Sequence, residues 1–209
     1  MKIIEYDKSL DKRRIADSAY NICGNTQFPV EYQDVYNHLF EKEDLIVKLL
    51  MNKENKLAGF GVFENYRLNI ENQTLTMLYL SGMVIDKKYQ GKNISKEIIK
   101  CTYDELQSDL ISLRTQNIAM AKSLLSVYED NLFVMPGKMN KNVIDYLRTT
   151  PPFQSLDENG IIKNCYPTQL YPDLIAIESN YGIILQPTDA LGVVIEPSKN
   201  KQKVKSYFS

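Results

Sequence analysis

The stretch that decides the fold is TLTMLYLSGMVIDKKYQGKNISKEII, which spans Thr74–Ile99. Its segment Met77–Ile85 is rich in Leu, Met, Val and Tyr and contains no Pro, a composition that favours a buried strand. Residues Gln90–Ser95 follow and open a predicted helix with one apolar face, formed by Ile94, Ile98, Cys101 and Thr102. The first turn of a helix has unpaired N–H groups and the positive end of the helix dipole, so this join is a predicted anion site.

Residues Tyr89–Ser95 resemble a known cofactor-binding motif. Their sequence, YQGKNIS, is similar to the acyl-CoA signature of the GCN5-related N-acetyltransferases (GNAT): Gln or Arg, two residues, Gly, any residue, and Gly or Ala. The signature glycines are here Asn93 and Ser95. Asn tolerates unusual backbone angles better than other non-Gly residues, and Ser is small. The resemblance implies that the cofactor pyrophosphate contacts Gln90, Gly91, Lys92, Asn93, Ile94 and Ser95. An ordinary strand-to-helix turn is the alternative.

The order of the predicted elements extends this resemblance. Strands are predicted at Lys2–Tyr6, Leu45–Met51, Leu57–Leu68, Thr74–Ile85 and Leu110–Thr115. The predicted helices are one capped by Ser9 and stopped by Gly24 and Asn25, one after Pro29, one opened by Gln90, and one at about Asn117–Asp130. This is the element order of the GNAT-like acyl-CoA N-acyltransferase fold. We therefore expect an α/β (mixed α+β) fold with a central, mostly antiparallel, twisted sheet flanked by helices.

Length and composition favour one compact protein. The chain has 209 residues, of which 44% are apolar, enough for a sizeable core. We expect a single GNAT-like domain over residues 1–209. Residues 131–209 form an extended C-terminal part that completes the sheet, with a closing strand at Leu191–Glu196. The lysine-rich residues 197–209 are expected to form a flexible tail.

The resemblance also implies a reaction and the backbone groups that serve it. In this family a primary amine attacks the thioester carbonyl of acetyl-CoA and forms a tetrahedral oxyanion. A kink or bulge around Ser81–Val84 would leave backbone groups of Met83, Val84 and Ile85 for the pantetheine arm. The Val84 N–H would face the thioester oxygen as a catalytic donor. Asn117 would contact the arm, and a role as helix N-cap is an alternative compatible with that contact.

The proton donor and the base are less defined by the sequence. The Tyr that usually protonates the departing thiolate lies seven residues after the Asn, where this chain has Leu124. Tyr128 lies one turn further along the same helix face, about 5.4 Å along the axis, and is the candidate acid. A core or rim tyrosine, with water releasing the thiolate, is the alternative. Tyr79, Glu64 and Glu71 are candidate bases, because an amine with a pKa of about 10.4 is almost fully protonated at pH 7.

We therefore expect an acyl-CoA-dependent N-acyltransferase that uses acetyl-CoA as co-substrate and acetylates a primary amine. A catalytically degenerate GNAT-fold acyl-CoA-binding or regulatory protein is the alternative, motivated by Asn93, Ser95 and Leu124 at positions where the family has other residues. A structural protein without a cofactor is a third hypothesis. The sequence leaves open whether the acceptor is a small molecule or a peptide N-terminus, and it leaves the oligomeric state open.

Composition also narrows the partners and the location. A net charge of −1 gives no support for a nucleic-acid or membrane partner. No apolar run reaches the length of a membrane span, and Met1–Asp7 lacks the apolar core of a signal peptide, so we expect a cytoplasmic location. Cys23, Cys101 and Cys165 are odd in number and far apart, which fits reduced thiols. The single histidine, His38, excludes a multi-His metal centre, and we expect no metal.

Overall fold

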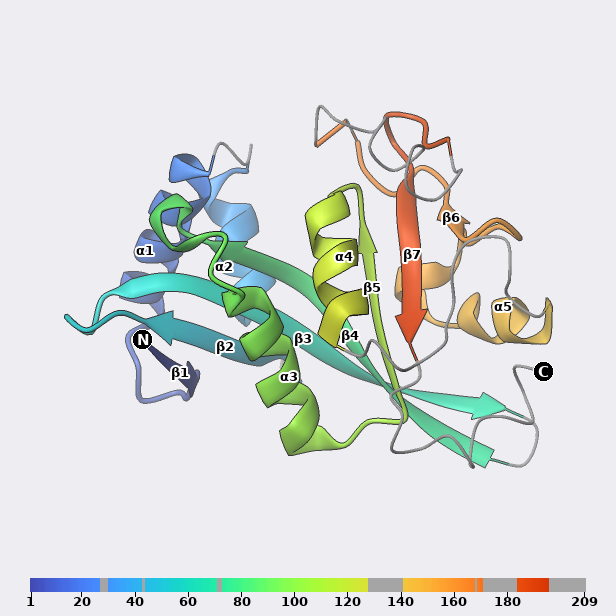
Figure 1. Ribbon diagram of the computed structural model, residues 1–209, viewed down its shortest axis with the longest axis horizontal. Helices are drawn as coiled ribbons and strands as arrows, with labels where there is room; N and C mark the ends of the chain where they lie inside the picture. Colours follow the sequence, from blue (N-terminus) through green and yellow to red (C-terminus); the bar gives the residue numbers. More distant parts are fainter. Residues whose placement is uncertain are drawn as a thin grey trace. The chain divides into compact units, whose positions relative to one another are not determined.

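The computed structural model describes residues 1–26, 30–42, 44–70, 73–127, 141–167, 169–170 and 184–195 (Figure 1). Within these residues, seven strands form one sheet in the order β1-β2-β3-β4-β5-β7-β6. Helices flank the sheet, and the pairs β1–β2, β2–β3, β5–β7 and β6–β7 are antiparallel. The predicted fold class, a mixed α+β fold with a mostly antiparallel sheet, is confirmed.

The chain folds as two compact units that share the long strands β3 and β4. Unit 1 consists of Met1–Asn65 and Leu80–Leu106, and unit 2 consists of the described residues of Tyr66–Tyr79 and Gln107–Ser209. Each unit has its own apolar core. No helix within the described ranges is long and apolar enough to cross a membrane.

Unit 1 contains the N-terminal strands and three of the helices. Its elements are β1 (Lys2–Glu5), α1 (Lys12–Asn25), α2 (Tyr32–Phe40), β2 (Ile46–Met51), the first part of β3 (Leu57–Ile70), the last part of β4 (Gln73–Ile85), the 3₁₀ turn η1 (Lys87–Tyr89) and α3 (Ile94–Leu106). The predicted strands and helices of this region are confirmed, with boundaries that move by a few residues. The largest shift is at α3, which begins at Ile94 and not at Gln90.

The ends of α1 differ from the prediction. Its N-cap is Asp11 and not Ser9, because the Asp11 carboxylate accepts hydrogen bonds from the N–H groups of Arg13 and Arg14. The backbone N–H of Ser9 instead donates to Asp7 in the preceding turn. Gly24 and Asn25 continue the helix as its last residues, and Thr26 caps it by donating its backbone N–H to carbonyls of the last turn.

The core of unit 1 lies between two helices and one face of the sheet. Side chains of α1 and α2 pack on β2 and β3 in a cluster formed by Ala19, Cys23, Val35, Leu39, Val47, Leu49, Phe60 and Val62. Helix α3 covers the opposite face, where a Cβ placed on Gly61 would touch the side chains of Ile98 and Met83. Successive residues of a strand point to opposite faces, so β3 serves both layers.

Unit 2 contains the C-terminal strands. Its elements are the end of β3, the start of β4, β5 (Leu110–Thr115), α4 (Ile118–Val127), α5 (Lys141–Leu147), the 3₁₀ turn η2 (Pro151–Phe153), β6 (Ile161–Ile162) and β7 (Ala190–Ile195). The predicted strand at Leu110–Thr115 is confirmed without change, and the closing strand is confirmed one residue earlier than Leu191–Glu196. β7 pairs with β5 in a register that places Ile111 opposite Ile195.

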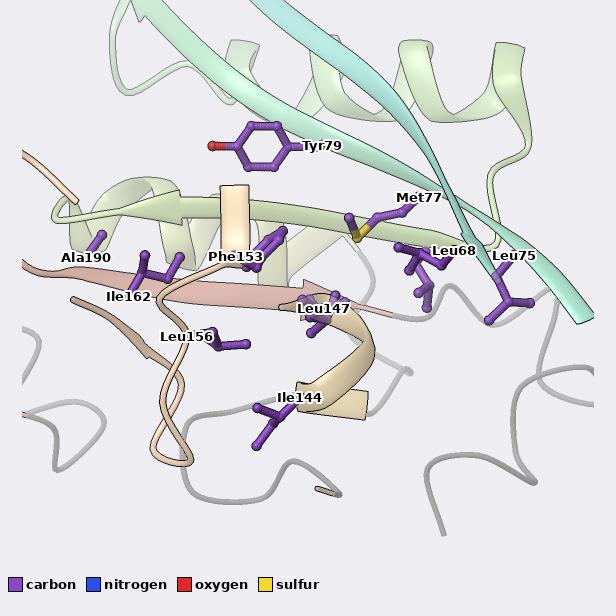
Figure 2. Close-up of a cluster of buried hydrophobic side chains, with 12 residues drawn as sticks. Leu68, Leu75, Met77, Tyr79, Ile144, Leu147, Phe153, Leu156, Ile162 and Ala190 are labelled. Carbon is purple, nitrogen blue, oxygen red and sulfur yellow. The ribbon is translucent and has the colours of Figure 1, made fainter. Parts of the chain in front are cut away.

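The core of unit 2 is a cluster that brings β3, β4 and β7 together with α5 and η2 (Figure 2). Its centre is aromatic. The ring of Tyr79 lies 5.8 Å from that of Phe153 and 6.1 Å from that of Tyr66, both in edge-on arrangements. Phe153 is fully buried and belongs to this cluster, so its ring joins the short η2 turn to the core.

Replacement of Phe153 by Ala tests this core. We expect a loss of about 3–5 kcal/mol in the free energy of unfolding, because the truncation removes buried apolar area and leaves a cavity. Ile184→Ala is the matched control, since Ile184 is 62% exposed, and it should change stability by less than about 0.5 kcal/mol. Urea denaturation of the full chain measures both, and equal effects of the two substitutions would contradict the assignment of Phe153 to the core.

Candidate functional site

The turn between β4 and α3 has a backbone conformation suited to an anion. After η1 the chain is extended at Gln90, and it then enters the left-handed region at Gly91 (φ 74°) and Asn93 (φ 59°) before α3 begins at Ile94. A glycine signature residue is expected where positive φ is needed, and Asn93 adopts such a φ in its place. Gly91, Lys92 and Asn93 are exposed, so the segment that leads into α3 is open to solvent.

Local hydrogen bonds and one buried side chain hold this turn. Asp86 caps η1, donates its N–H to the Ala58 carbonyl at 2.9 Å and accepts from the Lys88 N–H. The Gln90 carboxamide donates to the Ile85 carbonyl at 2.8 Å, so this side chain closes the turn on the end of β4. Ile94 is buried and fixes the start of α3 against unit 1. The backbone N–H groups that are predicted to bind an anion are therefore held in place by these contacts.

Positive charge surrounds the turn. Lys87, Lys88 and Lys92 are exposed, and Lys96 follows in the first turn of α3. The Lys88 and Lys92 ammonium groups lie 5.0 and 5.5 Å from the centre of the Tyr89 ring. Glu97 is the acidic residue of the first helical turn. The lysines add to the helix dipole and favour a multiply charged anion.

The end of β4 carries the predicted catalytic backbone. Met83, Val84 and Ile85 are half-buried at the end of this strand. The Val84 side chain packs on the core between α1, α2 and the sheet, and the Met83 side chain lies on the α3 side. The bulge predicted around Ser81–Val84, and with it the exposure of the Val84 N–H, stays a prediction.

Asn117 lies in unit 2, at the end of β5. Its side-chain oxygen accepts from the Ala119 N–H at 2.9 Å, and its N–H donates to the Thr115 hydroxyl at 2.8 Å. Asn117 therefore caps α4, the alternative that the sequence offered. The cap uses only the oxygen of the carboxamide, so its NH₂ group is a separate donor that a pantetheine arm could use.

Of the candidate proton donor and the candidate bases, Tyr79 and Glu64 lie within the described residues. Tyr128 and Glu71 lie outside the described residues, and Leu124 is fully buried in α4. Tyr79 is a core residue with 2% exposure. The Glu64 side chain is 15% exposed and pairs with Lys42 at 2.8 Å, and it lines a cavity of about 400 Å³ beside α2. Of the two bases that lie within the described residues, Tyr79 belongs to the core and Glu64 lines this cavity.

The cysteines are protonated thiols. Burial raises the pKa of Cys23 to about 11, and burial also raises the pKa values of Cys101 and Cys165. A protonated thiol is a poor nucleophile, so the described chain offers no activated cysteine to carry an acyl group. In the described ranges, no three His, Cys, Asp or Glu side chains converge in a way that could hold a metal ion.

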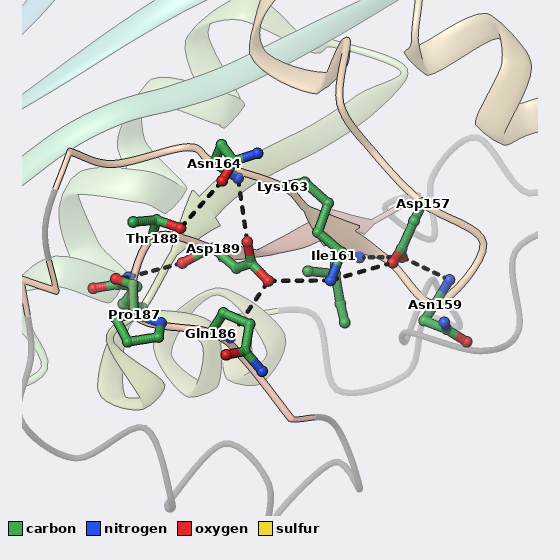
Figure 3. Close-up of polar contacts among 10 residues, drawn as sticks. Asp157, Asn159, Ile161, Lys163, Asn164, Gln186, Pro187, Thr188 and Asp189 are labelled. Carbon is green, nitrogen blue, oxygen red and sulfur yellow. Dashed lines mark hydrogen bonds and ion pairs between the residues drawn. The ribbon is translucent and has the colours of Figure 1, made fainter.

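A residue that sequence reasoning missed is Gln116, which directly precedes Asn117. Its side chain is buried, donates to the carbonyls of Pro187 and Asp189 at 2.8 Å, and accepts from the Leu170 N–H at 2.8 Å. The Asp189 carboxylate in turn accepts from the Lys163 ammonium and from the N–H groups of Asn164 and Gln186 (Figure 3). These partners are distant in the sequence, so no local pattern could have identified Gln116.

Replacement of Asn93 by Val tests the turn. The left-handed region costs a non-Gly residue about 1–2 kcal/mol, and more when its side chain is β-branched, so Asn93→Val should lower the free energy of unfolding by at least about 1–2 kcal/mol. Asn93→Gly relieves this strain and should stay within about 1 kcal/mol of the parent. Chemical denaturation measures both, and a neutral Asn93→Val variant would contradict the positive φ at this residue.

Replacement of Gln116 by Leu tests the buried network. The substitution leaves two carbonyls and one N–H of unit 2 without their partner, so we expect a loss of about 2–4 kcal/mol of unfolding free energy. The same change at the exposed Gln154 is the control and should alter stability by less than about 0.5 kcal/mol. Thermal and urea unfolding give the comparison. Similar stability of the two variants would show that the network contributes nothing.

Known structures share this architecture. The ribosomal-protein-S18-alanine N-acetyltransferase from Escherichia coli is similar over 94% of this chain and 94% of its own, with a TM-score of 0.55 and 15% sequence identity. Chaetomium thermophilum Naa20, solved in complex with a bisubstrate analogue, is similar over 97% of this chain and 90% of its own, with a TM-score of 0.56 and 6% identity. No protein-family model and no curated protein sequence matches the chain. The chain therefore has the fold of the GCN5-related N-acetyltransferase superfamily, as the motif at Tyr89–Ser95 predicted.

Proposed function

We propose that the protein is an acyl-CoA-dependent N-acyltransferase that transfers acetyl from acetyl-CoA to a primary amine. The observation that carries this proposal is the turn between β4 and α3. It combines two residues of positive φ, the exposed residues Gly91–Asn93 directly before the helix start, and four neighbouring lysines at the place where the sequence resembles an acyl-CoA signature. A pyrophosphate is the ligand whose charge suits this turn.

The residues of this turn divide the work of binding. The N–H groups from Gly91 to Ser95 receive the pyrophosphate, with Lys92 adding positive charge, while Gln90 and Ile94 hold the turn in place. The backbone of Met83, Val84 and Ile85 receives the pantetheine arm, and the resemblance assigns the NH₂ group of Asn117 to cofactor binding as well. The Val84 N–H donates to the thioester oxygen as charge develops there, a contribution of about 3 kcal/mol for one donor.

The transfer proceeds by direct attack. The amine nitrogen forms a bond to the thioester carbon, the oxyanion collapses, and the carbon–sulfur bond breaks. The nitrogen gives up a proton and the CoA thiolate gains one, so the products are an amide and free CoA. The raised pKa values of the three cysteines support this route over an acyl-enzyme on a thiol. Tyr128 is the proposed proton donor to the thiolate, and Glu64 is the proposed base.

The neighbours support the proposal at the level of the fold. One is named as an N-acetyltransferase of an alanine in ribosomal protein S18, and the other was solved with a bisubstrate analogue. A GNAT-fold protein that binds acyl-CoA without turnover is the second candidate. Two observations favour it: Asn93 and Ser95 occupy the signature glycine positions, and the buried Leu124 occupies the position of the usual tyrosine.

The melting temperature with saturating acetyl-CoA tests the cofactor. At 100 times its dissociation constant, the ligand should add about 2.7 kcal/mol, or about 5–10 °C for a chain of this size. Adenosine, which lacks pyrophosphate and pantetheine, should give no shift. Lys92→Glu should reduce the shift, and the same charge reversal at the exposed Lys53, in the turn after β2, is the matched control. No shift at millimolar acetyl-CoA would overturn the proposal.

Release of free thiol separates the two candidates. Acetyl-CoA with a broad panel of primary amines should yield CoA thiol faster than acetyl-CoA alone if the protein is an acyltransferase. Binding of acetyl-CoA without thiol release from any amine of the panel would favour the non-catalytic candidate.

A further inference from the structure

A cavity in unit 1 is not used by the cofactor residues proposed above. It has a volume of about 400 Å³ and lies between helix α2 and strands β3 and β4. The residues that line it are Asp34, Asn37, His38, Glu41, Lys42, Leu45, Glu64 and Ser81. Seven of these eight carry polar or charged side chains, so the cavity suits a hydrophilic ligand.

The charge of the lining is negative. Asp34, Asn37, His38 and Glu41 recur at three- and four-residue intervals, so they share one face of the helical turns of α2 and its C-cap. Glu64 approaches from β3 and is partly neutralised by Lys42, whose ammonium lies 2.8 Å away. Three carboxylates and one ammonium leave two negative charges in excess.

The cavity reaches the strand that carries Val84. Gly82 of β4 has no side chain, and the His38 imidazole occupies the space that a Cβ would take, with its Nε2 against the strand. Residues 82 and 84 lie on the same face of β4 and about 7 Å apart along it. One end of the cavity is therefore close to the position that the proposed function gives to the thioester.

The carboxylates are spread and not convergent. Asp34 and Glu41 are seven residues apart, or about 10 Å along the helix axis. Across the described residues, no three potential ligands are placed to hold a metal ion, this cavity included. Negative charge distributed over this length matches an extended organic cation better than a single compact ion.

We propose that this cavity is the acceptor site and that it takes a small aliphatic amine carrying a second ammonium group. The proposal rests on the proposed function. One nitrogen lies beside His38 and Gly82, where it can reach the thioester. The second ammonium remains protonated and pairs with one of two carboxylates, Asp34 or Glu41, which lie about one helical turn to either side of His38, so these carboxylates select for a diamine over a monoamine. A neutral or acidic acceptor forms no ion pair with these carboxylates.

Because His38 is the single histidine of the chain, binding of an amine in the cavity can be tested without knowledge of the natural acceptor. In the full chain without a histidine tag, the imidazole ¹⁵N signals come from His38 alone. We expect 1,4-diaminobutane to shift these signals saturably at constant ionic strength and pH, in the absence of acetyl-CoA. Butylamine should bind about three- to tenfold more weakly, because it lacks the second ion pair.

Charge removal in the cavity provides the control. The double variant Asp34→Asn, Glu41→Gln should remove the preference for the diamine. Glu31→Gln removes a charge from the N-cap of the same helix, outside the cavity lining, and should preserve the preference. Circular dichroism confirms that each variant is folded.

Two results would overturn the proposal: His38 signals that do not respond to the diamine, and a diamine preference that survives the double substitution. Either result combined with a melting shift by acetyl-CoA would leave the proposed function intact and remove only the acceptor assignment. Selective diamine binding without any effect of acetyl-CoA would overturn the role of the cavity in acetyl transfer, together with the proposed function.

Discussion

The burial of Ile94 is the contact on which the arrangement of the candidate site depends. A helix that is tied to the core at its first residue cannot fray there, so its unpaired N–H groups keep fixed positions. The left-handed residues Gly91 and Asn93 are a consequence, because the chain must reverse sharply between the end of β4 and a helix start held this close. Gln90 completes the arrangement by bonding back to the strand. Backbone geometry, and not a charged side chain, therefore defines the predicted anion site.

The two faces of β3 and β4 explain how one short segment of sheet can serve two purposes. On one face, α1 and α2 bury an apolar cluster and extend it into a polar cavity as the helix stripe changes from Val35 and Leu39 to Asp34 and His38. On the other face, α3 packs on residues such as Gly61. Because successive residues of a strand point to opposite faces, the side chains that face the proposed acceptor are different residues from those that pack on α3.

Much of the fold could be predicted because its signals are local. The strand at Leu110–Thr115 has the apolar residues Leu110, Ile111 and Leu113 within six positions, and the turn at Asn93 contains a residue type that tolerates positive φ. The misses have a common cause. Ser9 and Asp11 are both good caps, and only the path of the preceding chain decides between them. The elements α5, η2 and β6 are too short to show a period, and they are stabilised by contacts with distant parts of unit 2.

The candidate site, like the fold, could be predicted only where its residues are neighbours in the sequence. The motif located the join of β4 and α3, because it is contiguous in the sequence. The contact between His38 and Gly82 was not predictable, because these residues are 44 positions apart and meet only when helix α2 packs on strand β4. Gln116 was missed for the same reason. Contacts of this kind carry no periodic signal, and a polar residue in such a contact has the same local appearance as one on the surface.

The protonated cysteines have a practical consequence for oxidative chemistry. With a pKa of about 11, Cys23 is ionised in only about one molecule in a thousand at pH 8. Disulfide exchange requires the thiolate, so low-molecular-weight disulfides react slowly with this residue. An enzyme that releases CoA at every turnover would accumulate a reactive thiol beside itself. Burial of Cys23 slows its exchange with the disulfide that forms when this released thiol is oxidised.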